Sequence, residues 1–171
     1  MEIRVTKLQE VIDLVKPVIP RKPTVKSIAC ICLGNGKAVA TDLETVVVAN
    51  LPEAKEPMLL PYYAIAEMLK YIPGNNTLKI ELKGKMIFLS WNGGSASYPT
   101  GDVADYPILP EMAARADGLV DGDTLIAAMM VALPYVATDA TRPVLSGITL
   151  VLGTPIEIAA GVTASGCRIR C

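Results

Sequence analysis

Asp42 and Glu44 are the acidic pair whose spacing comes nearest to a cation site. Two residues apart on an extended strand, they would share one face and could bind a hard divalent cation with a third carboxylate, as a metal-dependent nuclease requires. The interpretation we favour is that they are solvated carboxylates closing a strand turn. The chain contains no histidine, which removes the usual base at neutral pH and the commonest zinc ligand. We therefore expect no enzyme activity, no catalytic residue, no cofactor and no metal.

The other reactive groups also lack the context that chemistry requires. Cys30 and Cys32 lie two apart in an apolar run and are expected to share one strand face as small hydrophobes. Cys167 and Cys171 stand in SGCRIRC, and without CxxC spacing or histidine the cysteines make a poor zinc site. GNGK at 34–37 lacks the spacing of a phosphate-binding loop and is better interpreted as a hairpin turn.

Charge must be considered locally, because the formal net charge of the chain is only −1. Arg21, Lys22 and Lys26 crowd one short segment, RKPTVK, that follows an apolar helical pattern. A few lysines and arginines in loops are enough to meet phosphates, and contacts that ignore base sequence leave a protein free to slide along DNA.

Composition predicts a globular protein without a membrane span. Half of the residues are apolar (51%) and 19% are charged. The longest apolar run, 125–137, is shorter than the roughly 20 residues that cross a bilayer. The opening MEIRVTKLQE has charges where a secretory signal needs an apolar stretch, so we expect a cytoplasmic protein.

The first hundred residues predict alternating strands and helices. Residues 1–6 alternate as a strand does, and apolar residues then recur at helical spacing from 8 to 19, with an end near Pro17 or Ile19. SIACICL and KAVATDLETVVVANL are β-rich and flank a Gly-Asn-Gly turn, a second helical stripe runs over 65–72, and 77–91 predicts a hairpin. The predicted order is β-α-β-β-β-α-β-β, an α+β unit with antiparallel strands.

The chain then begins the same plan again. Residues 101–122 lack periodicity and contain two prolines and four aspartates, which predicts a linker. After it, DTLIAAMMVALPYVATDATRPVLSGITLVL repeats the helix, proline, basic-Pro loop and β run of residues 6–33, with Arg142 in the equivalent loop. A period of about 120 residues is too long for a solenoid and is typical of tandem duplicated domains.

Several segments jointly resemble the beta subunit of bacterial DNA polymerase III, the sliding clamp. They are the RKPT loop, AVATDLETVVVANL, MLLPYYAIAEMLKYIPGNNTLKIEL, IFLSWNGGSASYPTGDVADYPILPE and MVALPYVATDATRPVLSGITLVL. The resemblance implies a DNA-clamp fold, tandem units of antiparallel sheets with two helices each, of which the second is incomplete. It divides the chain into the N-terminal clamp domain, 1–118, and a partial middle domain, 119–160.

Residues 161–171 leave the family pattern, which calls for a segment like Thr-Asp-Gly-Phe-Arg-Leu, or the same with histidine in place of phenylalanine, after Ala159-Ala160. Codons for Gly-Val-Thr-Ala-Ser-Gly-Cys-Arg, read from the third base of the first codon, can give Cys-Asp-Gly-Phe-Arg-Leu-Ser. Our hypothesis is that 161–171 is an out-of-frame tail caused by a frameshift. The nucleotide sequence downstream would decide it.

The resemblance also implies a function, a processivity factor that encircles duplex DNA and tethers the replicative polymerase. In the family, three-domain subunits pair head to tail into a homodimeric ring, and polymerase and clamp loader bind between the middle and third domains. This chain would then be a truncated form. The alternative is a short clamp paralogue that acts as a protein-interaction module without encircling DNA.

The resemblance places the two basic loops and the polar helix faces toward the duplex. For each charge the alternative is an ordinary solvated side chain, and it is the favoured one for Lys16 and Lys70. The second-copy helix, LIAAMMVALPYV, has no basic residue, so its apolar surface is either buried by the remainder of its domain or left exposed. The predicted DNA-binding residues are Arg21, Lys22, Lys26, Arg142, Lys70 and Lys16.

Overall fold

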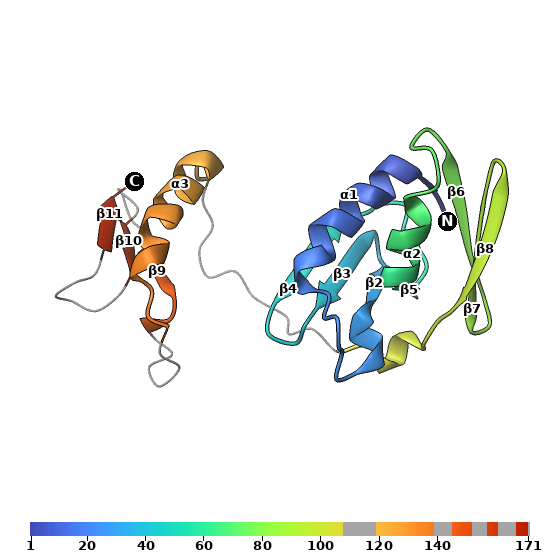
Figure 1. Cartoon of the computed structure of the whole chain (residues 1–171), viewed down its shortest axis with the longest axis horizontal. Coiled ribbons are helices and arrows are strands. Elements are labelled where there is room, and N and C mark those ends of the chain that lie inside the picture. The colour runs from blue at the N-terminus through green and yellow to red at the C-terminus, as the bar shows by residue number, and fades with distance from the viewer. Residues whose placement is uncertain (108–118, 139–144, 152–156, 161–166, 171) are drawn as a thin grey trace. The chain divides into compact units, whose positions relative to one another are not determined.

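The computed structural model describes residues 1–107, 119–138, 145–151, 157–160 and 167–170 (Figure 1). The chain forms two compact units, Met1–Pro110 and Glu111–Cys171, and each is described by itself. None of the helices in the described ranges is long and apolar enough to cross a bilayer.

One sheet of the first unit contains β1 (Glu2–Arg4), β6 (Thr77–Lys83), β7 (Met86–Trp91) and β8 (Gly94–Pro99). Neighbouring strands are antiparallel and follow the order β1-β6-β7-β8. Apolar and polar residues alternate along β6 and β7, so one face of the sheet is buried and the other is solvated. The buried face contains Ile3, Leu78, Ile80, Ile87 and Leu89.

The second sheet of this unit contains β2 (Cys30–Gly34), β3 (Lys37–Thr41), β4 (Val46–Asn50) and β5 (Met58–Pro61), in the order β4-β3-β2-β5. The predicted hairpin at Gly34-Asn35-Gly36 is confirmed, because β2 and β3 pair across it. Asn35 and Gly36 have φ of 52° and 72°, the left-handed pair that a type I′ turn requires. Cys30 and Cys32 share the half-buried face of β2, and burial raises the pKa of both thiols.

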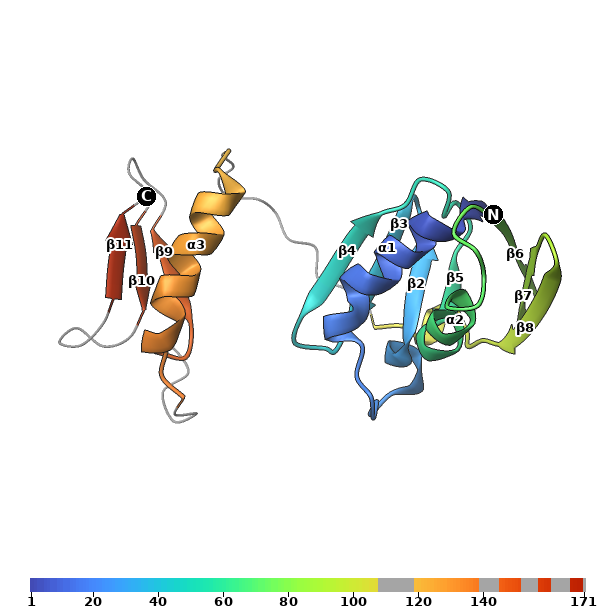
Figure 2. The same cartoon turned by 45° about the horizontal axis from the view of Figure 1, so that its top comes forward.

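Two helices share one core with the sheets. α1 (Val5–Val15) buries Val5, Leu8, Val11, Ile12 and Val15, and α2 (Tyr62–Leu69) buries Tyr62, Ile65, Met68 and Leu69. The two helices lie side by side (Figures 1 and 2), and their buried residues join those of both sheets in a single apolar cluster. Short 3-10 turns follow at η1 (Lys16–Val18), η2 (Lys26–Ala29) and η3 (Val103–Asp105). Pro17 lies in η1, so the regular helix ends at Val15 because proline lacks the N–H that would continue it.

Two strands were not predicted from the sequence. β5 is a short run, MLLP, without alternation, and β8 (GSASYP) consists mostly of small residues with low strand propensity. Each becomes a strand because its backbone pairs antiparallel with a neighbouring strand, β5 with β2 and β8 with β7. The first strand is also shorter than the predicted 1–6, since the helix already begins at Val5.

The first part of the predicted linker packs on the first unit. Tyr106 is 8% exposed, and its hydroxyl donates a hydrogen bond to the Val39 carbonyl over 3.2 Å. The Ser27 hydroxyl donates to the Asp105 carbonyl over 2.8 Å. Burial next to Cys32 and Cys30 raises the pKa of Tyr106, so the hydroxyl remains a donor at neutral pH.

The second unit repeats the opening elements of the first. It contains α3 (Gly122–Ala132), η4 (Leu133–Tyr135), β9 (Ile148–Val151), β10 (Glu157–Ala160) and β11 (Cys167–Arg170), with the sheet order β11-β10-β9. The Asp121 carboxylate caps α3 by accepting from the Thr124 N–H over 2.9 Å. β11 falls in the predicted out-of-frame tail, and its backbone pairs antiparallel with β10, from Ala160↔Cys167 to Glu157↔Arg170.

Candidate nucleic-acid interface

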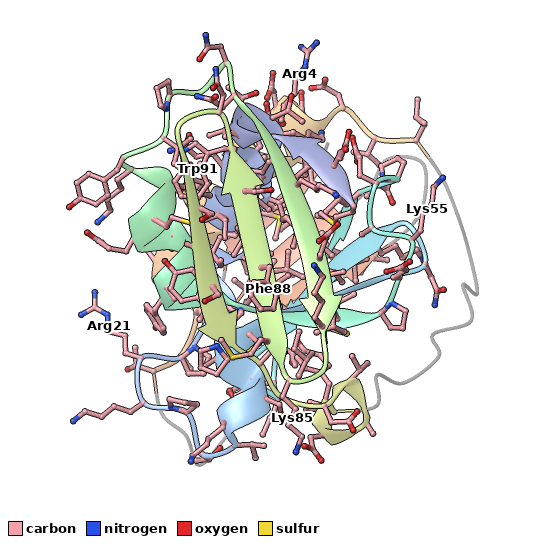
Figure 3. The ribbon with its side chains drawn as sticks, turned by 90° about the vertical axis from the view of Figure 1, so that its right-hand side faces the viewer. Arg4, Arg21, Lys55, Lys85, Phe88 and Trp91 are labelled. Carbon is pink, nitrogen blue, oxygen red and sulfur yellow. The ribbon has the colours of Figure 1, made fainter. Side chains whose placement is uncertain are left out.

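The loop between η1 and η2 is held at both ends and exposed in the middle. Val18 and Ile19 are each 6% exposed at its start, and Ile28 is 2% exposed at its end. Between these anchors the side chains of Arg21 and Lys22 are exposed, and Figure 3 shows Arg21 projecting away from the ribbon. Buried residues therefore anchor both ends of the loop, and its charged side chains project into solvent.

Arg21 and Lys22 are electrostatically available. Within the described part of the chain, neither forms an ion pair with an acidic side chain. A cation without an intramolecular partner can bind a phosphate without first breaking an existing interaction. Lys16 and Lys26 also form no ion pair among the described residues, but each lines a hollow that an acidic residue shares. Arg21 and Lys22 are therefore the best placed of the predicted DNA-binding set.

Lys26 has a different setting from the two residues before it. It is the first residue of η2, it is exposed, and it lines a cavity of about 590 Å³ together with Cys30, Leu59 and Asp105. The basic loop thus begins in open solvent at Arg21 and ends at the rim of an apolar cavity.

Lys16 and Lys70, which are far apart in sequence, line the same hollow between α1 and α2. Its volume is about 300 Å³, and Asp13 and Glu67 line it as well. The Lys70 ammonium lies 2.5 Å from the Glu67 carboxylate, and this hydrogen-bonded pair raises the pKa of Lys70 and lowers that of Glu67. With two basic and two acidic residues, the hollow carries no excess positive charge.

The acidic residues of this hollow were missed from the sequence, although a signal was present. Asp13 precedes Lys16 by three positions and Glu67 precedes Lys70 by three, a spacing that places both members of a pair on one helix side. Tyr63 was also missed: its hydroxyl donates to the Ile19 carbonyl over 3.4 Å and links α2 to the base of the loop. Arg142 lies outside the described residues.

The predicted strand placement of Asp42 and Glu44 is wrong. Both lie in the turn between β3 and β4, where one Asp42 carboxylate oxygen accepts from the N–H groups of Glu44 and Thr45 over 3.0 and 2.6 Å. These hydrogen bonds lower the pKa of Asp42. The favoured interpretation, a carboxylate closing a turn, is confirmed for Asp42, whereas Glu44 contributes its backbone N–H. Among the described residues no group of three metal-ligating side chains occurs.

Comparison with solved structures places this geometry in a known architecture. A sliding clamp, the DNA polymerase III beta subunit, from Pseudomonas aeruginosa aligns over 100% of this chain with a TM-score of 0.82 and 19% identity. The beta subunit from Streptococcus pyogenes aligns over 99% with a TM-score of 0.78 and 14% identity. The chain has the sliding-clamp fold. The clamp from Bacillus subtilis agrees, with a TM-score of 0.77, 15% identity and 99% of this chain covered.

The clamp-fold likeness confirms the predicted fold class and includes both units. The chain spans about half the length of these clamps, 49% of the first and 52% of the other two. No protein-family model matches the sequence, and neither does any curated protein. At such low identity the likeness establishes the fold.

Proposed function

We propose that this chain supplies the first domain and the start of the middle domain of a DNA polymerase processivity factor. Such a factor is non-catalytic: it encircles duplex DNA as a ring and tethers the replicative polymerase. The observation that carries the proposal is the clamp fold along the whole chain, at a TM-score of 0.82. Because the chain spans 49% of that clamp, ring closure and the binding of polymerase and clamp loader would need parts beyond those described.

The charge distribution supports a sliding contact with DNA. On the exposed side of α1, Lys7 pairs with Glu10 over 3.4 Å, and the hollow toward α2 is also balanced. Among the described residues, Arg21 and Lys22 in the loop carry positive charge without an ion-pair partner. A ring needs only weak, sequence-independent phosphate contacts, because topology rather than affinity prevents its loss from DNA. We propose Arg21, Lys22, Lys26 and Arg142 as the main phosphate contacts and Lys16 and Lys70 as weaker ones.

The test is salt-dependent retention of duplex DNA by the purified 171-residue chain and by Arg21→Ala/Lys22→Ala. We expect the double variant to bind more weakly, with the slope of log K against log salt reduced by about 0.9 for each phosphate that the loop no longer neutralises. The matched control is Lys37→Ala/Lys55→Ala, which removes the same charge from exposed positions elsewhere on the first unit. Equally weakened retention in both double variants would indicate a general charge effect and refute the assigned loop. Unchanged retention in Arg21→Ala/Lys22→Ala would also refute it.

The alternative function, a short clamp paralogue that binds proteins, has one observation in its favour. α3 exposes Ile126, Met130 and Val131 by 61%, 63% and 58%, and apolar residues exposed to this extent on one helix are typical of a protein contact. A natural interaction module would be a stable, soluble particle on gel filtration and would bind a partner without retaining DNA. Retention that depends on Arg21 and Lys22 would favour the clamp.

A further inference from the structure

The solvated face of the β1-β6-β7-β8 sheet differs from an ordinary polar surface. We call it the outer sheet face, and Figure 3 looks onto it. Strand alternation and the pairing registers define its members, because residues directly opposite one another project to the same side. They are Glu2 and Arg4 on β1, Thr77, Lys79, Glu81 and Lys83 on β6, Met86, Phe88 and Ser90 on β7, and Ser95, Ser97 and Pro99 on β8.

Phe88 lies in the middle of this face (Figure 3). It is the only phenylalanine of the chain, and its side chain is 40% exposed instead of contributing to the core. Its direct cross-strand neighbours are Glu81 on β6 and Ser97 on β8. Serine is too short to cover an aromatic ring, so the ring stays open to solvent on the β8 side.

Lys83 lies beside the ring on the β6 side, and two further lysines belong to the same hairpin. The Lys83 ammonium lies 5.5 Å from the Phe88 ring centroid, within the range of a cation–π contact. Lys79 and Lys83 both bind the Glu81 carboxylate, over 2.6 and 3.0 Å, so one negative charge is shared by two positive ones. Lys85, at the β6–β7 turn, is exposed and adds a further positive charge at the end of the hairpin (Figure 3).

We propose that the outer sheet face binds single-stranded nucleic acid, with a base stacked on Phe88 and the flanking phosphates on Lys79, Lys83 and Lys85. A part-exposed aromatic ring beside lysines on a sheet surface offers both contacts that a single strand needs, a π-face for a base and cations for the backbone. A duplex keeps its base faces inside the stack and cannot use the ring. The site is separate from the Arg21–Lys22 loop and extends the proposed function from duplex to unpaired strand.

The experiment measures fluorescence anisotropy of a labelled oligothymidylate of about 15 nucleotides, within the usual site size, with the 171-residue chain at low salt. We expect salt-dependent binding that Phe88→Leu weakens at least about fivefold, because leucine keeps apolar area but has no π-face. Phe88→Trp should bind at least as tightly as the wild type. Tyr71→Leu is the matched control, since Tyr71, just beyond the end of α2, is 78% exposed and lies off this sheet.

Circular dichroism shows whether each variant is folded. If Phe88→Leu does not fold, Phe88→Trp still tests the proposal, because weaker binding by a folded Phe88→Trp would contradict it. Three results would overturn the proposal. The first is no binding of the oligonucleotide, and the second is equally weakened binding in Phe88→Leu and Tyr71→Leu. The third is displacement of the labelled oligonucleotide by duplex DNA or polyglutamate as effectively as by unlabelled oligothymidylate. If Arg21→Ala/Lys22→Ala abolishes binding while Phe88→Leu does not, the single strand is held by the loop and the proposal is also wrong. Failure of this site would leave the duplex contact untouched.

Discussion

The basic residues discussed above that lie in the described ranges are all exposed, and they differ mainly in whether an acidic side chain of the chain already pairs with them. Arg21 and Lys22 carry charge without an acidic partner among the described residues, whereas Lys70 shares its charge with Glu67. Lys79 and Lys83 hold Glu81 between them and still leave a positive balance. The sequence predicted a role for Arg21, Lys22 and Lys70 but not for Lys79 or Lys83. Only the three-residue helical spacing of Glu67 and Lys70 indicated that a charge is neutralised. A cross-strand pair such as Glu81 and Phe88 depends on register, which no local pattern supplies.

Glu81 should show this partnership directly in its titration. Its two lysine partners lower its pKa from 4.5 to about 2 by hydrogen bonding and charge. Because the folded-state pKa is depressed, the stabilisation is complete above about pH 4.5 and is lost as pH falls toward 2. We expect an NMR titration of the Glu81 carboxyl carbon to show a midpoint near 2 and a return toward 4.5 in Lys79→Ala/Lys83→Ala. A wild-type midpoint near 4.5 would show that the lysines do not hold the carboxylate in solution.

Asp42 allows a test of turn closure against catalysis. Asp42→Ala removes the acceptor of two backbone N–H groups, so we expect a lower melting temperature. Glu44→Ala, whose side chain makes no hydrogen bond among the described contacts, should leave the melting temperature nearly unchanged. Incubation with DNA and Mg²⁺ should give no cleavage with either variant or with the wild type. Cation-dependent cleavage that vanishes in Asp42→Ala would reverse the assignment.

At the scale of elements, the sequence predicted what local chemistry determines. The β2–β3 hairpin follows from Asn35 and Gly36, and α1 from apolar residues at helical spacing. β5 and β8 could not be predicted, because their strand state comes from ladders to β2 and β7 rather than from their own residues. The hollow shared by Lys16 and Lys70 is a tertiary product of the same kind, since two helices must first pack side by side.

The β2–β3 turn should be sensitive to a single methyl group. Gly36 has φ of 72°, a conformation that costs an L-residue roughly 1–2 kcal/mol, so Gly36→Ala should lower the free energy of unfolding by about that amount. Gly101→Ala is the control, because the added Cβ would meet Leu59 at an ordinary contact distance of 3.5 Å. Urea unfolding followed by circular dichroism measures both. Equal effects of the two substitutions would mean that the turn conformation does not set the cost.

At the scale of the molecule, the two units have unequal interiors. The first buries large side chains from both sheets and both helices, such as Leu8, Leu60 and Ile65, all 0% exposed. Among the described residues of the second, the buried cluster is Ala128, Ala132, Ile158 and Ala160. Three of these four residues are alanines, which remove little apolar area from water, and the larger residues packed against them, such as Leu125 and Ile148, are only partly buried. The described cluster therefore contributes less to stability than the core of the first unit. The repeat was visible in the sequence, but the sequence left open whether the apolar surface of the second-copy helix is buried or exposed, because α1 and α3 are both apolar enough to be core helices.

The difference in burial predicts that the units unfold separately. Because burial of apolar area is the main stabilising term, the second unit should open at a lower urea concentration and be the first to be cleaved by protease. We expect limited trypsin digestion, followed by mass spectrometry, to leave a fragment of the first unit ending near residue 118.

α3 exposes Ile126 and Met130, so the intact chain should also elute early from gel filtration as an associated species, and the fragment should elute as a monomer. A single cooperative transition with uniform protease resistance would show instead that the second unit is stably folded, the result expected of a natural short clamp paralogue.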